Sequence, residues 1–125
     1  MLEEKMLEKK VWAVVGANEN AEKYGNMIYK KLKTFGYKVY PVNPKYQVIE
    51  GDKCYSNLSL LPEKPDVINM VVSPNIGKTV IEEAANLGVE NIWLQPGTYN
   101  DEIINLIDKK GINAVKACVL MSLNK

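Results

Sequence analysis

A short apolar run that stops at a glycine is the feature that most constrains the fold of this chain. Residues 11–15 (VWAVV) lead directly into Gly16 and a polar turn, and helical spacing of apolar residues begins at Tyr24. The pattern predicts a strand, a glycine turn and a helix. The first N–H groups of a helix have no partner within it, and the helix dipole adds about half a positive charge there. Such a segment is typical of a phosphate site, and Gly25 would allow close approach; a plain strand–helix turn is the alternative.

The same alternation of strand and helix continues along the rest of the chain. Further strands are predicted at residues 38–42, 67–72, 91–94 and 114–118. The helices between them are expected to end at Gly36, Gly88 and Gly111, and the last of them begins after Asn100. This order predicts an α/β fold in a single domain. We expect three layers, with a Rossmann-like, doubly wound and mainly parallel sheet covered by helices on both faces.

Smaller features complete the predicted layout. Residues 1–10 are charged and predict an N-terminal arm or short helix, and a short edge strand is expected around Cys54. Trp12 and Trp93 lie in strand-like runs and are interpreted as core residues. The buried helix faces are predicted from apolar residues at helical spacing: Tyr24, Ile28, Leu32 and Phe35, then Ile76, Val80, Ala84 and Leu87, then Ile103, Ile104 and Ile107.

Length and charge exclude several classes of protein. The 125 residues suit one domain that buries roughly two-thirds of its unfolded surface. The 16 Lys and Arg against 15 Asp and Glu give a net charge of +1, so no strong field favours nucleic acid or an anionic membrane. No apolar run approaches the ~20 residues of a membrane span, and the start of the chain lacks the apolar core of a signal peptide. Two cysteines, Cys54 and Cys118, are too few for a disulfide framework. A reduced, cytoplasmic protein is expected.

The sequence contains no histidine. This absence excludes Ser-His and Cys-His nucleophilic systems, histidine metal sites and phosphohistidine chemistry. Acid–base catalysis by carboxylates or lysines remains possible, but no motif in the sequence places two such groups together. We therefore predict no catalytic residue and no metal site.

A doubly wound sheet brings two turns together where the strand order reverses. They are the turn after the first strand, residues 16–25, and the turn after the central strand, residues 73–75. The residues disfavour NAD as the ligand, because Gly16 does not begin a G-x-G-x-x-G motif. The second strand ends in Asn43 with Lys45 close by, where a dinucleotide site would have a ribose-binding carboxylate. An amide and a lysine would instead suit a nucleotide with an extra phosphate. The alternative is that these residues form an ordinary turn that binds no ligand.

Four blocks in this order carry a resemblance to a known family. They are residues 11–25, the segment GYKVYPVNP at 36–44, the segment DVINMVVSPN at 66–75, and NIWLQPG at 91–97. Together they resemble the small, stand-alone CoA-binding domain proteins, which are similar to the N-terminal CoA-binding domain of the succinyl-CoA synthetase α subunit. The resemblance covers about residues 10–118. It implies a Rossmann-like domain, at residues 11–125, that binds coenzyme A and has no established chemistry of its own.

The resemblance also implies roles for individual residues. The pyrophosphate loop corresponds to Gly16, Ala17, Asn18, Lys23, Tyr24 and Gly25. The segment beside the adenosine phosphate corresponds to Asn43, Pro44 and Lys45, and the turn along the ligand to Val72, Ser73 and Pro74. The block nearer the pantetheine corresponds to Trp93, Gln95 and Gly97.

The first loop departs from the family pattern. Asn18 stands where the family usually has serine, a proline of the loop is absent, and Glu19 and Glu22 bring negative charge near the implied site. Asn18 can still donate a hydrogen bond to a phosphate oxygen. The leading hypothesis is a non-catalytic protein that binds CoA or an acyl-CoA, alone, as a homodimer or beside a protein partner. The alternative is a small NAD(P)-binding or acyl-CoA-processing enzyme with an unidentified catalytic group.

Overall fold

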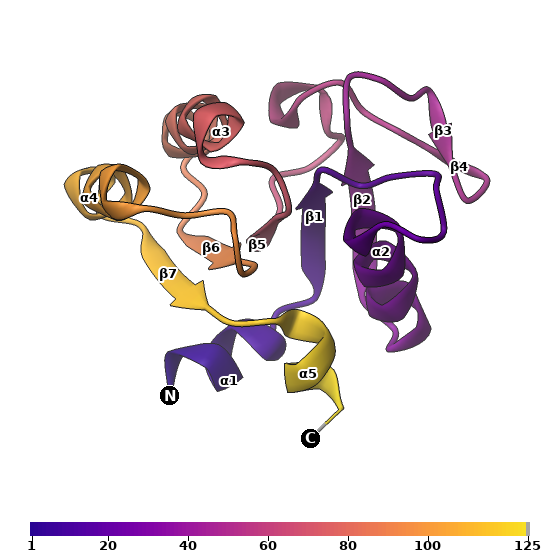
Figure 1. The fold of residues 1–125 in the computed structure, drawn as a ribbon, viewed down its shortest axis with the longest axis horizontal. Helices are drawn as coiled ribbons and strands as arrows, with labels where there is room; N and C mark the ends of the chain where they lie inside the picture. Colours follow the sequence, from indigo (N-terminus) through magenta and orange to yellow (C-terminus); the bar gives the residue numbers. More distant parts are fainter. Residues whose placement is uncertain (125) are drawn as a thin grey trace.

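Five parallel strands form the central sheet of the computed structural model, which describes residues 1–124 (Figure 1). They are β1 (Val11–Val15), β2 (Lys38–Val42), β5 (Val67–Met70), β6 (Asn91–Leu94) and β7 (Asn113–Lys116). Their order across the sheet is β2-β1-β5-β6-β7, and each neighbouring pair is parallel. The chain runs outward from β1 to β2, returns past β1 to β5, and continues to the other edge. The sheet is therefore doubly wound, as predicted.

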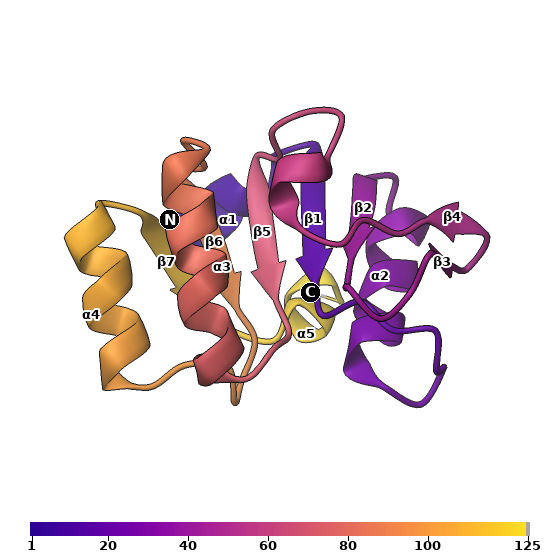
Figure 2. The same ribbon diagram turned by 90° about the horizontal axis from the view of Figure 1, so that it is seen from above.

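Helices cover both faces of this sheet. On one face lie α3 (Pro74–Asn86) and α4 (Asp101–Lys110), and Figure 2 shows these two helices side by side. On the other face lie α2 (Tyr24–Thr34) and the shorter helices α1 (Leu2–Leu7) and α5 (Val119–Leu123) (Figure 1). The three-layer, Rossmann-like α/β architecture expected from the sequence is confirmed.

One apolar core lies on each side of the sheet. Because successive side chains of a strand point to opposite faces, Ala13 and Ile68 belong to the core beneath α3 and α4, whereas Trp12 belongs to the core beneath α2. Trp12 and Trp93 are fully buried, and their ring centroids lie 5.8 Å apart. Their interpretation as core residues is confirmed.

The predicted buried faces of two helices are wrong at their ends. Tyr24 and Phe35 of the first stripe are 64% and 49% exposed, and Ile76 of the second is 56% exposed. Leu87, at the end of that stripe, is also exposed. Tyr24 and Ile76 lie in the first turns of α2 and α3, which extend past the carboxyl ends of the strands (Figure 2). Phe35 and Leu87 are the residues at which the two helices end. Periodicity alone does not reveal where the sheet beneath a helix ends.

The segment between β2 and β5 also differs from expectation. A single short edge strand was expected around Cys54; the chain forms an antiparallel hairpin of β3 (Val48–Ile49) and β4 (Asp52–Lys53), followed by a short 3₁₀ helix η1 (Leu58–Leu60). The chain reverses at Glu50 and Gly51, which have φ angles of 50° and 79°. Positive φ at two successive residues is typical of a tight hairpin turn. The expected strand around Cys54 is confirmed in part: β4 ends just before Cys54, and Tyr55 forms a parallel bridge to Val42 of the edge strand β2. The pairing of β4 with β3 was not predicted.

The charged N-terminal segment is held against the domain. Met6 of α1 is buried in the core on the α2 side, and the hydroxyl of Tyr37 donates a hydrogen bond to the carbonyl oxygen of Leu7. The hydroxyl of Ser122 in α5 donates to the Glu3 carboxylate at 2.8 Å. Helices α1 and α5 therefore lie together below the sheet in Figure 1.

Candidate functional site

Two adjoining pockets lie at the carboxyl ends of β1 and β5, where the strand order reverses. The first, of about 410 Å³, lies between the end of β2, residues 56–58 and α3. The second, of about 620 Å³, lies between the start of α2, the turn after β6 and α5. Gly16, Val71 and Val72 line both pockets, so the two form one continuous cleft. This is the place in a doubly wound sheet where ligands bind, and the two turns predicted to meet there do meet.

Gly16 and Gly25 make the close approach of backbones that the cleft requires. Gly16 has a φ of +100°, and a Cβ there would lie 3.0 Å from the carbonyl group of Val71. A Cβ on Gly25 would lie 2.0 Å from the carbonyl oxygen of Gly16. The sequence suggested that Gly25 leaves room for a ligand. The structure gives a further reason for glycine, because the start of α2 packs directly on the end of β1.

Two helices begin at the cleft, and neither has a side-chain cap. Lys23 is the N-cap of α2 and Ser73 that of α3, and neither side chain accepts a hydrogen bond from its helix. Within residues 1–124 the N–H groups of Tyr24 and Gly25 have no acceptor. The unpaired N–H groups and the positive ends of two helix dipoles make this part of the cleft suitable for an anion.

The side chains of the loop after β1 are held in a defined arrangement. The Oδ1 atom of Asn18 accepts hydrogen bonds from the Asn20 N–H at 2.8 Å and from the Tyr46 hydroxyl at 3.2 Å. These bonds leave the Nδ2 group of Asn18 as a donor beside the second pocket. The Nδ2 group of Asn43 donates to the carbonyl oxygen of Ala17 at 2.9 Å. Asn43 therefore supports this loop through its side chain.

The charges around the cleft are favourable for an anion. Lys23 lines the second pocket and Lys45 lines the first, whereas Glu19 and Glu22 line neither. One oxygen of the Glu19 carboxylate accepts a hydrogen bond from the Glu50 N–H at 3.1 Å. The carboxylate of Glu19 is thus directed at the β3–β4 hairpin, and that of Glu22 lines neither pocket.

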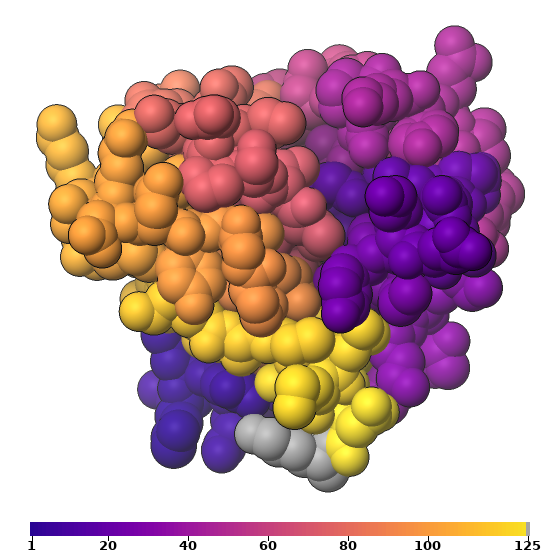
Figure 3. All heavy atoms as spheres, viewed as in Figure 1, coloured from indigo at the N-terminus to yellow at the C-terminus, as the bar shows by residue number. Residues whose placement is uncertain are grey.

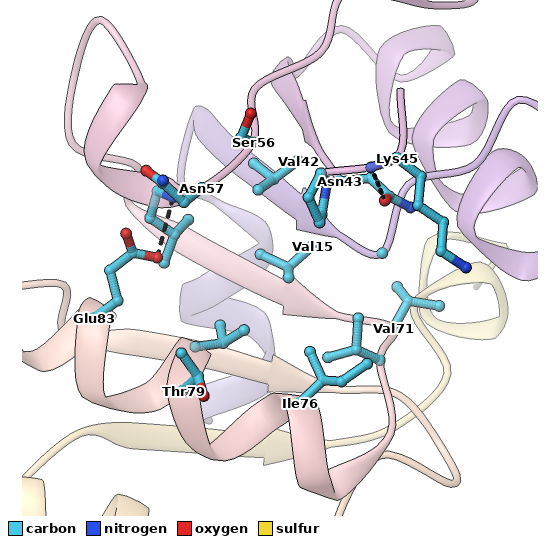
Figure 4. A pocket seen from close by; sticks show the side chains of 15 residues that line it. Val15, Val42, Asn43, Lys45, Ser56, Asn57, Val71, Ile76, Thr79 and Glu83 are labelled. Atoms are coloured by element: carbon cyan, nitrogen blue, oxygen red, sulfur yellow. Dashed lines mark hydrogen bonds between the residues drawn. The ribbon is translucent and has the colours of Figure 1, made fainter. Parts of the chain in front are cut away.

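The first pocket has apolar walls and a polar rim (Figure 4). Val15 and Val42 lie on the sheet side, and Ile76 on the α3 side. The carboxylate of Glu83 also borders this pocket, but it accepts hydrogen bonds from the N–H groups of Leu58 and Ser59 at 3.1 and 3.2 Å. The pocket can hold a flat, largely apolar group such as a nucleobase, with polar atoms turned toward the rim.

The far end of the second pocket combines a buried amide with two sulfur-containing side chains. Gln95 is 4% exposed, and its Oε1 atom accepts a hydrogen bond from the Val119 N–H at 3.0 Å. Its Nε2 group has no partner within residues 1–124, and Cys118 and Met121 line the same pocket. Figure 3 shows the segments concerned meeting on one face: the indigo loop after β1, the orange turn after β6 and the yellow α5.

The cleft brings together most of the residues predicted from the sequence. The first pocket is lined by Gly16, Asn43, Pro44, Lys45 and Val72, and the second by Gly16, Asn18, Lys23, Tyr24, Gly25, Val72, Ser73, Gln95 and Gly97. Ala17 and Pro74 line neither pocket. Ala17 is fully buried, and Pro74 is the first residue of α3. Trp93 lies within the sheet core, where its indole N–H donates to the carbonyl oxygen of Ala117 at 2.9 Å.

Other lining residues were not predicted as part of a site. They are Val15, Val42, Ser56, Asn57, Leu58, Val71, Ile76, Thr79, Val80, Glu83, Pro96, Thr98, Cys118 and Met121. The position of Ile76 at the cleft could have been predicted, because an apolar residue two positions after a helix-opening proline belongs to the first turn, near the strand ends. No sequence feature predicts that residues 56–58 and α5 line the cleft, because only the path of the chain in three dimensions brings them there.

A family model described as a CoA binding domain matches residues 10–124. The chain belongs to this family. The family expected from the four sequence blocks is therefore confirmed. No helix within residues 1–124 combines the length and apolar character needed to cross a bilayer, and the same residues hold no group of three or more potential metal-ligating side chains.

Relatives of the domain occur in ligases and as small proteins. The ADP-forming acetate–CoA ligase I of Archaeoglobus fulgidus is 39% identical over 122 residues, which are 90% of this chain and 18% of the ligase. The α subunit of the ADP-forming acetate–CoA ligase II of Pyrococcus furiosus is 33% identical over 114 residues, 82% of this chain and 25% of that subunit. The chain thus spans at most about a quarter of the length of these ligase relatives.

Solved structures include proteins of similar size. A conserved hypothetical protein from Pyrococcus furiosus has a TM-score of 0.85 at 41% identity, over 90% of this chain and 98% of that one. A hypothetical protein from Pyrococcus horikoshii has a TM-score of 0.90 at 35% identity, over 96% and 85% of the two chains. The fold therefore also occurs in chains that contain little else.

Proposed function

We propose that this protein binds coenzyme A, or an acyl-CoA, as a ligand that it does not transform. The observation that carries the proposal is the uncapped N-terminus of α2 beside the cleft. The N–H groups of Tyr24 and Gly25 have no acceptor there, and Lys23 and the Nδ2 group of Asn18 lie around them. Backbone N–H groups, an amide and an ammonium group together suit a pyrophosphate. Membership of the CoA-binding family supports this choice of ligand.

The two pockets suggest how the ligand lies. In the proposed orientation, the adenine occupies the apolar first pocket and the 3′-phosphate lies near Lys45 at its rim. The pyrophosphate lies at Gly16 and the start of α2, where the pockets join. The pantetheine then extends along Val72 and Ser73 into the second pocket. Its amides are expected to meet Gln95, whose Nε2 group is free to donate.

The side chains of the cleft support a binding role without catalysis. Its ionisable side chains are Lys23, Tyr24, Lys45, Glu83 and Cys118, and no hydrogen bond or ion pair within residues 1–124 joins any two of them. The Glu83 carboxylate is engaged by backbone and side-chain donors of residues 58–59. A nucleophile needs a base within hydrogen-bonding reach, and this cleft offers no such pair.

The proposed setting is that of a carrier, a sensor or a partner subunit. The relative named as the α subunit of a ligase favours the last of these, since that protein is one part of a larger assembly. A homodimer and a cytoplasmic location stay predictions from the sequence.

Titration calorimetry with CoA and dephospho-CoA tests the proposed function. We expect wild-type protein to bind both and to prefer CoA, because only CoA carries the 3′-phosphate. The substitution Lys45→Glu should lower the affinity for CoA by about tenfold or less, because the contact is solvent-exposed. It should lower the affinity for dephospho-CoA much less. Lys10→Glu is the matched control, because it makes the same charge change at the opposite end of the sheet. Absence of CoA binding by the wild-type protein would overturn the proposed function.

A further inference from the structure

The β3–β4 hairpin is fastened to the loop that borders the second pocket, although it lines neither pocket itself. Ile49 is fully buried in the core on the α2 side. The Glu50 N–H donates to a carboxylate oxygen of Glu19 at 3.1 Å. Asp52 accepts hydrogen bonds from the Tyr29 hydroxyl and the Lys33 ammonium group of α2. The hairpin is therefore anchored at its apolar side, at its turn and at its second strand.

Asn26 joins this hairpin to the loop. Its side chain, on the first turn of α2, is 1% exposed. The Nδ2 group donates to the carbonyl oxygen of Asn18 at 2.9 Å, lies 3.5 Å from that of Glu19, and donates to a carboxylate oxygen of Glu50 at 2.9 Å. A single buried amide thus uses its two N–H groups to join the carbonyl group of Asn18 in the loop to the tip of the hairpin.

The backbone of Glu50 indicates that its contact with Asn26 matters. Glu50 has a φ of 50°, and within residues 1–124 no other residue except glycine has a positive φ. A side chain in this conformation is unfavourable, and asparagine, aspartate or glycine would fit such a turn better. The Glu50 carboxylate reaches the buried amide of Asn26 from this position. The strained residue therefore stands where it closes the contact between hairpin and loop.

The fixed loop carries the groups proposed to hold the pyrophosphate. With its carbonyl oxygen held by Asn26, Asn18 presents its Nδ2 group to the second pocket. The loop continues through Lys23 to the unpaired N–H groups of Tyr24 and Gly25. A loop free to move would present these donors in many geometries, and the ligand would have to order them on binding. Preorganised donors avoid that cost.

We propose that Asn26 is a positioning residue for the pyrophosphate loop and that Glu50 braces it through the hairpin. The inference rests on the proposed function and adds to it residues that do not touch the ligand. It predicts that loss of the brace weakens CoA binding through the pyrophosphate, with no special effect on the 3′-phosphate.

Calorimetry of matched variants tests the inference. Asn26→Ala should lower the affinity for CoA by about tenfold or more, because more than one buried hydrogen bond is lost at once. Glu50→Ala, at an exposed position that the fold tolerates more readily, should weaken it by about threefold to tenfold. Glu50→Gln keeps an oxygen acceptor for Asn26 and should restore affinity close to that of the wild type. In all three variants, the ratio of the dissociation constants for dephospho-CoA and CoA should equal the wild-type ratio.

Asn91→Ala separates positioning from stability. The Asn91 Nδ2 group also bonds a carbonyl oxygen, that of Asp66 at 3.1 Å, but at the amino ends of the strands. This variant should lower the melting temperature and leave the affinity for CoA unchanged.

Each outcome decides between the two proposals. If wild-type protein does not bind CoA, the proposed function and this inference fall together. If it binds CoA, and both Asn26→Ala and Glu50→Ala bind within about twofold of the wild type, only the positioning role is overturned. A changed preference between CoA and dephospho-CoA would also overturn it, because the brace would then act at the 3′-phosphate. If Asn26→Ala fails to fold, the comparison of Glu50→Ala with Glu50→Gln still tests the positioning role.

Discussion

The two cysteines lie in different surroundings. Cys54 is 7% exposed, and its thiol contacts the carbonyl oxygen of Asn43 at 3.4 Å. Burial raises the pKa of the Cys54 thiol, which reduces the population of the reactive thiolate. Cys118 is partly exposed and lines the second pocket. Nothing in the sequence distinguishes the two cysteines. In the structure only Cys118 lines the cleft, so only its thiol would be accessible to a ligand bound there.

Alkylation rates should report this difference. We expect iodoacetamide to modify Cys118 at least about tenfold faster than Cys54 in the folded protein, because reaction of a buried thiol needs local opening. Saturating CoA should slow modification of Cys118, since the proposed pantetheine path covers it, and should not affect Cys54. Mass spectrometry of peptides after timed quenching measures both rates. Equal rates for Cys118 with and without CoA would place the pantetheine elsewhere, and urea-unfolded protein gives the intrinsic rates for comparison.

At the scale of elements, the attachment of the β3–β4 hairpin to α2 depends on ionisation. The hydrogen bonds from Lys33 and then from Tyr29 hold the pKa of Asp52 below its usual value. Burial raises the pKa of Tyr29, so its hydroxyl keeps the proton that it donates to Asp52. A carboxylate with a lowered pKa in the folded state stabilises the fold above its unfolded-state pKa, and this contribution is lost as the pH falls through the folded-state pKa.

The substitution Asp52→Asn measures this contribution. At pH 7 we expect the free energy of unfolding to fall by about 1 kcal/mol or less, because the pair is partly exposed and screened by solvent. Well below pH 3.8, the ordinary pKa of the group, the wild type and the variant should be equally stable. Urea unfolding at both pH values provides the comparison. A difference that persists in acid would mean that shape and packing, and not charge, hold the hairpin.

At the scale of the whole molecule, ligand choice should appear in thermal stability. A ligand that binds only the folded state adds RT ln(1 + [L]/Kd), or about 2.7 kcal/mol at a hundredfold excess over Kd. For a domain of this size that corresponds to several degrees in the melting temperature. CoA should produce such a shift, dephospho-CoA a smaller one, and NAD none. The residue after the second strand, β2, is Asn43 and offers no carboxylate for a ribose, and the Glu83 carboxylate is already bonded to residues 58–59.

Differential scanning fluorimetry with the three ligands at equal concentration gives the ranking. A larger shift with NAD than with CoA would favour the alternative of a dinucleotide-binding enzyme. Acetyl-CoA recovered unchanged after incubation at the melting-assay concentrations serves as the control for turnover. Hydrolysis or acyl transfer that a single substitution abolishes would contradict the non-catalytic role.

The sequence by itself determined the fold class and most of the elements of this protein. Strands β2 and β6 were predicted with their observed bounds, and Gly36, Gly88 and Gly111 stand in the left-handed conformation expected at helix ends. The Asn100 side chain accepts a hydrogen bond from the Ile103 N–H, as a helix cap should. These features succeed because they depend on local rules: apolar runs, turn glycines and caps act within a few residues.

Only the tertiary structure decided how the cleft is built. The hairpin tip at Glu50 meets the amide of Asn26 and the carboxylate of Glu19 through contacts that span 24 and 31 residues of sequence. Asn69 illustrates the same limit, because its buried amide group has no partner within residues 1–124, and nothing in its strand-like run distinguishes it from its neighbours. Periodicity specifies which side of an element is apolar. Where that side stops, and which polar groups meet beyond it, depends on how strands and helices of different lengths pack in three dimensions.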